Sequence, residues 1–133
     1  NIVPDRCSMI AEVRSRDLDK LNAQAAHIQS CLQQACEQFG AQLDCKPVTN
    51  YVSYRVSPES ETVKPLLAAF ERLGCKANIT QGGGGSDANI YNQKGLESVV
   101  LGTGMTKVHT TAEYITIENL NNTARLALDL LTH

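Results

Sequence analysis

The chain has 133 residues, which fits one domain or two small parts of one domain. Its composition, with 42% hydrophobic and 20% charged residues, is that of an ordinary globular protein and excludes disorder of the whole chain. A formal net charge of −2 and the lack of any Lys/Arg cluster exclude the electrostatic footprint of a nucleic-acid-binding protein. The apolar stretches are much shorter than the roughly 20 residues that a membrane-spanning helix needs, so we expect no membrane partner.

The cysteines and the first residue lead to two further expectations. Five cysteines, an odd number without CxxC spacing, argue against a disulfide framework or a structural zinc knuckle and favour a cytoplasmic location. The chain begins at Asn1, with no initiator Met and no signal peptide, already within strand-like sequence. We therefore expect it to be a piece of a longer protein.

The first half of the chain predicts a strand, a helix and a second strand. Apolar and polar side chains alternate over residues 7–15, which is typical of a strand with one buried face. Apolar residues then recur at steps of three and four over a predicted helix that begins after its N-cap, Asp17, and ends at Gly40. A position covering a sheet suits this helix, with a short coiled coil as the alternative. Residues 43–56, rich in Val, Thr and Tyr, predict the second extended segment.

A polar turn over residues 57–60 predicts a boundary between two domains, 1–56 and 57–133. After this turn, the order helix, strand, helix, strand, helix indicates an α/β sheet, whereas the first half indicates part of an α+β layer. The elements predicted there are a helix over 62–73, a strand over 77–80, a short helix that begins at Ser86 or Asp87, a strand over 98–101 and a helix over 116–131.

Three features of the sequence could carry chemistry. The glycine run 82–85 precedes a helix N-terminus, where backbone N–H groups can bind an anion, although a flexible loop before a helix cap explains it equally well. His109 would lie in a loop at the carboxyl end of a strand, with Glu113 near enough to support it; a surface His beside a solvated carboxylate is the simpler interpretation. Arg14 shares a strand face with Glu12, and its guanidinium suits either a substrate carboxylate or a salt bridge.

Three motifs follow one another in the second half of the chain. They are Gly-Gly-Gly-Ser-Asp-Ala-Asn-Ile-Tyr-Asn-Gln-Lys-Gly at 83–95, Val-Val-Leu-Gly-Thr-Gly-Met at 99–105 and Val-His-Thr-Thr-Ala-Glu-Tyr-Ile at 108–115. Together they resemble the C-terminal end of the zinc exopeptidase family of peptidase T, carboxypeptidase G and succinyl-diaminopimelate desuccinylase, and the peptidase T-like branch in particular. Asn-Ile-Val-Pro-Asp at 1–5 and Glu-Val-Arg-Ser-Arg-Asp at 12–17 are similar to the lid, or dimerisation, domain of the same family.

The resemblance implies part of an α+β lid domain followed by the C-terminal part of an α/β catalytic domain. It also implies a role for several residues. These are His109 as a metal ligand and, for substrate binding, Asn1, Arg14, Gly84, Gly85 and Ser86. In the family the other zinc ligands and the general-base Glu belong to sequence upstream of Asn1. We therefore expect no catalytic residue in this chain and no activity from it alone.

The expected whole protein is a peptidase T-like metallopeptidase, a tripeptide aminopeptidase or dipeptidase that hydrolyses short peptides with two zinc ions. Another amidohydrolase of the same family, such as a deacylase or a desuccinylase, is the alternative enzyme. A non-catalytic dimerisation module is the alternative of a different class. The resemblance to the lid domain, together with a predicted exposed strand edge, implies a homodimer formed through residues 1–56.

Overall fold

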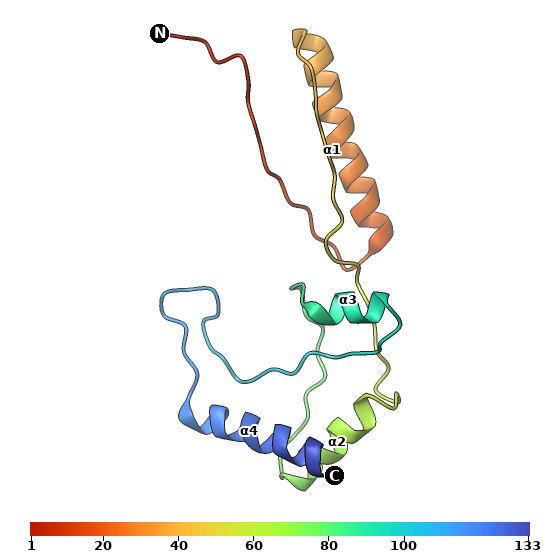
Figure 1. Cartoon of the computed structure of the whole chain (residues 1–133), viewed down its shortest axis with the longest axis vertical. Coiled ribbons are helices and arrows are strands. Elements are labelled where there is room, and N and C mark those ends of the chain that lie inside the picture. The colour runs from red at the N-terminus through yellow and green to blue at the C-terminus, as the bar shows by residue number, and fades with distance from the viewer. The chain divides into compact units, whose positions relative to one another are not determined.

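The computed structural model of the chain describes residues 1–133 and divides them into two compact units, residues 1–53 and residues 54–133. The first unit contains the long helix α1 (Leu18–Phe39). The second contains α2 (Val63–Arg72), α3 (Asp87–Gln93) and α4 (Ile117–Thr132) (Figure 1). All four helices were predicted, and none has the length and apolarity needed to cross a bilayer.

Helix α1 begins and ends at the residues that the sequence predicts. The Asp17 carboxylate accepts a hydrogen bond from the Lys20 N–H at 3.1 Å, which satisfies one of the free donors of the first turn. Gly40 takes a left-handed φ of 67°, and the next N–H, that of Ala41, donates to the Cys36 carbonyl at 2.8 Å. Both predicted caps are confirmed.

The apolar stripe of α1 is only half-buried. The side chains that lose part of their exposure are Leu21, Ala25, Ile28, Leu32 and Cys36, at the predicted steps of three and four. No residue of α1 is fully buried, and Phe39 at its end is 79% exposed. Helix α1 is therefore amphipathic as predicted, but its apolar face stays partly exposed to solvent within this unit.

The predicted strands do not pair into a sheet. Residues 7–15, 43–56, 77–80 and 98–101 are non-helical, drawn-out segments (Figure 1), and the structure has a single isolated antiparallel bridge, between Thr106 and Tyr114. The predicted burial of one face over residues 7–15 is wrong for this chain, because Met9 on that face is 73% exposed. A strand is stabilised by the neighbours with which it pairs, and alternation along one segment does not supply them.

In residues 54–133, α2 packs against α4, and the buried apolar residues of this pair are Ala69 in α2 and Leu126 in α4. Ala88 in α3 is buried apart from these two helices. Gly74 ends α2 with a left-handed φ of 67°, as its place in the sequence predicts. The Glu97 carboxylate accepts hydrogen bonds from Thr62 and Ser60, just before α2, which lowers the pKa of Glu97.

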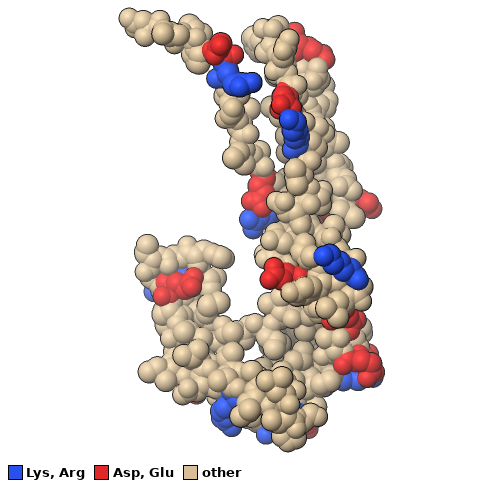
Figure 2. Space-filling model, in the orientation of Figure 1, with Lys and Arg blue, Asp and Glu red and all other residues tan.

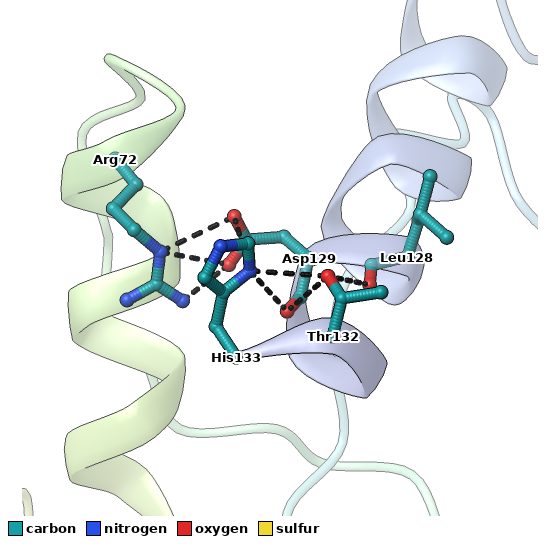
Figure 3. Close-up of polar contacts among 5 residues, drawn as sticks. All are labelled: Arg72, Leu128, Asp129, Thr132 and His133. Atoms are coloured by element: carbon teal, nitrogen blue, oxygen red, sulfur yellow. Dashed lines mark hydrogen bonds and ion pairs between the residues drawn. The ribbon is translucent and has the colours of Figure 1, made fainter.

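An ion pair joins α2 to α4 (Figure 3). The Arg72 Nε atom lies 3.0 Å and 3.2 Å from the two carboxylate oxygens of Asp129, and the guanidinium approaches the same carboxylate through a second nitrogen. Asp129 is only 12% exposed at its side chain, and His133 lies 3.9 Å from it. The hydrogen bonds from Arg72 hold the pKa of Asp129 below its ordinary value of 3.8.

We expect this carboxylate to make the chain sensitive to acid. Because the pKa of Asp129 is lower in the folded chain than in the unfolded one, its contribution is complete above the ordinary value of 3.8 and is lost as the pH falls further. Urea unfolding of the wild type should therefore show a larger loss of stability below about pH 4 than unfolding of Asp129→Asn, which has no charge to lose. Asp44→Asn, at an exposed carboxylate, is the control. Equal pH dependence of the wild type and Asp129→Asn would contradict the expectation.

The loop before α4 requires glycine at one position. Gly104 has a φ of 83°, and a Cβ atom there would lie 2.5 Å from the Asn119 side-chain nitrogen. That nitrogen instead donates a hydrogen bond to the Gly104 carbonyl at 3.1 Å. The close approach ties residues 102–104 to the first turn of α4.

Gly104→Ala should therefore destabilise the chain by about 1–3 kcal/mol, the usual cost of a left-handed non-glycine residue, before any clash with Asn119 is added. Gly102→Ala is a matched control, because Gly102 has no left-handed φ and no atom within 4 Å of the added Cβ. Urea unfolding followed by circular dichroism measures both variants. The same loss in both would show that the geometry at Gly104 has no special cost.

Candidate functional site

His109 lies in a short closed loop between α3 and α4. The Thr106 N–H donates to the Tyr114 carbonyl at 2.9 Å, and the Tyr114 N–H donates back to the Thr106 carbonyl at 3.1 Å. This pair of hydrogen bonds closes residues 106–114 into a hairpin-like turn, which we call the His109 loop. The imidazole is exposed and has no hydrogen bond within the chain, so both ring nitrogens are available to a ligand.

Contacts inside the His109 loop support an uncommon backbone geometry. Lys107 and His109 both have positive φ, 55° and 65°, which non-glycine residues rarely adopt. The Thr110 hydroxyl donates to the Lys107 carbonyl at 2.7 Å. The Glu113 carboxylate accepts the backbone N–H of His109, also at 2.7 Å. The loop that presents His109 is therefore held by its own polar side chains.

The glycine run is exposed and leads into α3 as predicted. Gly84 and Gly85 are exposed, and Ser86 is half-buried at the N-cap of α3. The Ser86 N–H donates to the Asn89 side-chain oxygen at 2.9 Å, and Asn89 is 8% exposed. The predicted start of this helix at Ser86 or Asp87 is confirmed.

Asn92 secures α3 from its other end. Its side-chain nitrogen donates to the carbonyls of Ala88 and Ser98, at 2.7 Å and 2.8 Å. The Ser98 N–H in turn donates to the Asn92 side-chain oxygen at 3.3 Å. Residue 98, at the start of a predicted strand, is thus attached to the helix that follows the glycine run.

Arg14 and Glu12 form a two-pronged ion pair in residues 1–53. The Arg14 Nε atom lies 2.7 Å from one Glu12 oxygen, and a second guanidinium nitrogen lies 3.0 Å from the other. Hydrogen bonding to Arg14 lowers the pKa of Glu12. Both side chains are about two-thirds exposed, at 68% and 65%, so the guanidinium already holds a carboxylate where solvent can reach it.

Charged side chains elsewhere are arranged in the same local way. On the face drawn in Figure 2 they stand in small groups, several of which combine both signs, with uncharged surface between them. The exposed pairs Lys46–Asp44 and Lys64–Glu61 are examples, at 3.3 Å and 2.8 Å.

The candidate residues are distributed over both units. Asn1, which is exposed, and Arg14 belong to residues 1–53, whereas Gly84, Gly85, Ser86 and His109 belong to residues 54–133. No three His, Cys, Asp or Glu side chains of the chain gather where they could hold a metal ion. The roles assigned to these six residues from the family resemblance therefore stay predictions.

Two side-chain contacts were not predicted, one inside the His109 loop and one just before it. Thr110 and Asn119 act through hydrogen bonds to backbone carbonyls, those of Lys107 and Gly104, and no spacing rule in the sequence announces such partners. Nor was a pocket of about 200 Å³ predicted between α2, α4 and residues 102–104, lined among others by Phe70 and Leu126. Its lining combines apolar with polar side chains, such as Asn119 and Thr123, and holds none of the candidate residues.

Comparison with known sequences shows relatives along most of the chain, while no family model matches it. It is 28% identical over 131 residues to the uncharacterized protein YqjE of Bacillus subtilis, which covers 98% of this chain and 35% of that protein. It is 27% identical over 121 residues to a succinyl-diaminopimelate desuccinylase of Helicobacter hepaticus, which covers 90% of this chain and 29% of that enzyme. The chain thus spans about a third of the length of these relatives.

Comparison with solved structures gives a match to the aminopeptidase PepT of Bacillus cereus. The TM-score is 0.68 and the identity 29%, over 84% of this chain and 30% of that one. The predicted peptidase-type α/β fold class is confirmed by this likeness, although in this chain the strand segments are unpaired. The motif-based prediction is confirmed as well: the chain is a relative of the family that includes peptidase T and succinyl-diaminopimelate desuccinylase.

Proposed function

We propose that this chain is the C-terminal part of a metal-dependent hydrolase, specifically a peptidase T-like aminopeptidase or dipeptidase acting on short peptides. The observation that carries the proposal is the likeness to the aminopeptidase PepT, at 29% identity and a TM-score of 0.68. The relationship to hydrolases supports the reaction class, while the choice of short peptides follows from the peptidase T-like motifs at 83–95 and 108–115.

His109 is the residue of this chain proposed to hold a metal ion. An exposed imidazole without a hydrogen bond, on a loop that is already closed, fits a zinc ligand. A catalytic zinc site takes about three protein ligands, so those of a two-zinc centre have to include residues of the whole protein beyond this chain. When bound, zinc activates a water molecule and polarises the amide carbonyl.

The other candidate residues are proposed to hold the far end of the substrate. The Arg14 guanidinium can bind a carboxylate through two nitrogens, because it binds Glu12 in this way. A substrate carboxylate could take the place of Glu12, and Asn1, at the far end of the same extended segment, is the second residue of this unit proposed to bind substrate. In residues 54–133, Gly84, Gly85 and Ser86 are proposed to contact the substrate as well. The two glycines are exposed and would offer backbone N–H groups, whereas the Ser86 N–H already donates to Asn89. Such anchoring sets the position of the scissile bond relative to the metal.

A metal-dependence assay on the whole protein tests the proposal. We expect hydrolysis of tripeptides or dipeptides that stops after treatment with a chelator and returns when zinc is added. Amide hydrolysis that survives removal of the metal, or no hydrolysis of any amide substrate, would overturn it. Cleavage of N-succinyl or N-acyl amino acids in preference to peptides would favour the alternative amidohydrolase, which the similarity to a desuccinylase supports. A metal-free protein that only self-associates would be the non-catalytic dimerisation module.

We also propose that the protein is a homodimer formed through residues 1–56. Apolar side chains of the first segment are strongly exposed, with Ile2 at 94%, Val3 at 88% and Ile10 at 103%. An extended segment without a partner is a template for pairing with a second copy. Sedimentation should show a dimer or larger species at micromolar concentration, and Ile10→Lys should weaken it. Ile79→Lys, at an exposed residue of the other unit, is the control. A monomer at high micromolar concentration, with residues 1–56 folded, would refute the dimer.

A further inference from the structure

We propose that Glu113 is a positioning residue for His109, fixing the backbone from which the imidazole is presented to a metal ion. The inference rests on the proposed function, because it takes His109 as a metal ligand. The Glu113 oxygen that accepts the backbone hydrogen bond would contact neither the metal nor the substrate. Its role is to make one geometry of the His109 loop stable before any metal binds.

The hydrogen bond to the backbone of His109 is the first support. The Glu113 Oε2 atom lies 2.7 Å from the His109 nitrogen, whereas most backbone N–H···O bonds are near 2.9–3.0 Å. A carboxylate acceptor strengthens such a bond and shortens it. This acceptor reaches the very residue whose side chain is the candidate ligand, from four positions along the chain.

The backbone strain of the loop is the second support. The φ of 65° at His109 and of 55° at Lys107 are left-handed values that a residue with a Cβ adopts only when its surroundings impose them. The φ angle sets the direction of the Cα–Cβ bond, and hence of the imidazole. Among the side-chain contacts of the loop, Thr110 acts on the Lys107 carbonyl, and Glu113 is the side chain that acts on His109 itself.

Closure of the loop does not depend on the Glu113 side chain. The two hydrogen bonds between Thr106 and Tyr114 join backbone atoms, and the Glu113 N–H donates to the Thr110 carbonyl at 3.1 Å. Replacing the Glu113 side chain should therefore leave residues 106 and 114 paired while freeing the backbone of His109. Glu113→Gln keeps an acceptor oxygen, and Glu113→Ala removes it. Glu118→Ala, at an exposed carboxylate in the first turn of α4, is the control.

Amide hydrogen exchange of the metal-free chain tests the local part of the inference. The His109 amide should be protected in the wild type and in Glu113→Gln, and should exchange about ten-fold faster or more in Glu113→Ala. The Thr106 and Tyr114 amides should be unchanged in all variants, which shows that the loop stays closed. An unprotected His109 amide in the wild type, or equal protection in Glu113→Ala, would overturn the inference.

Chelator competition in the whole protein tests the effect on the metal. Loss of an outer residue that orients a ligand typically weakens metal binding by about 10–100-fold, and we expect this loss in Glu113→Ala. Glu113→Gln should restore most of the affinity, and the KM at saturating zinc should be unchanged. If His109→Ala weakens zinc binding and Glu113→Ala does not, the inference fails while the proposed function stands. If neither variant changes zinc binding, both fail.

Discussion

His109→Ala in the whole protein should lose one metal ion per active site and reduce turnover by about a hundred-fold or more, because a catalytic metal contributes several kcal/mol to its reaction. The fold should survive, since the imidazole is exposed and has no hydrogen bond within the chain. Metal content by atomic spectroscopy and peptidase rate, at equal circular dichroism, measure the two effects.

The control for this variant is His27→Ala. His27 is an exposed residue of α1 whose ring lies 3.6 Å from the Cys31 sulfur, and it has no proposed part in metal binding. We expect its metal content and its activity to match the wild type. Unchanged zinc stoichiometry in His109→Ala would rule out His109 as a ligand. The isolated chain should bind no zinc tightly, because one imidazole is too few ligands.

Arg14→Ala should lower kcat/KM of the whole protein by about ten- to a hundred-fold. Hydrogen bonds to charged groups contribute about 1.5–3 kcal/mol, and each 1.4 kcal/mol corresponds to a factor of ten. The structure shows the required geometry in the pair with Glu12, where two guanidinium nitrogens reach two carboxylate oxygens. Steady-state kinetics on a peptide with a free C-terminal carboxylate gives the measurement.

A peptide amidated at its C-terminus separates binding from structure. This substrate has no carboxylate for the guanidinium, so Arg14→Ala should affect its hydrolysis much less. Arg6→Ala, at an exposed residue of the same extended segment, should change neither substrate. Equal losses on the free and the amidated peptide would mean that Arg14 has a structural role only.

The helices could be predicted because their signals are local. Asp17 and Gly40 mark the ends of α1 through contacts with residues three to five positions away, and Gly74 ends α2 in the same manner. Strand pairing could not be predicted in the same way. The residues of a segment such as 98–101 favour an extended backbone, but they do not determine which other segment it pairs with. The alternation of apolar and polar residues therefore predicted the extended segments correctly, whereas the prediction that they pair into a sheet was wrong.

For the candidate site, too, the sequence predicted position along the chain but not the contacts that shape it. Motif spacing located His109 between a strand-like segment and α4, and the structure places it in that connection. It could not indicate that His109 has a left-handed backbone, because only glycine announces such a conformation in a sequence. Nor could it distinguish Glu113 as a hydrogen-bond acceptor from a solvated carboxylate, since the bond is to a backbone N–H that every residue has.

The packing of this chain does not require glycine in the run before α3. At Gly82, Gly83 and Gly84 the backbone is not left-handed, and an added Cβ would meet nothing within 4 Å, so the folded chain would accept alanine at each. Alanine would also narrow the unfolded ensemble and favour folding by about 0.4–1 kcal/mol per position. The three glycines thus lower the stability of the folded chain and contribute nothing to its packing. The bare backbone of the run stays open to whatever approaches it, which is what the proposed contact with a substrate requires.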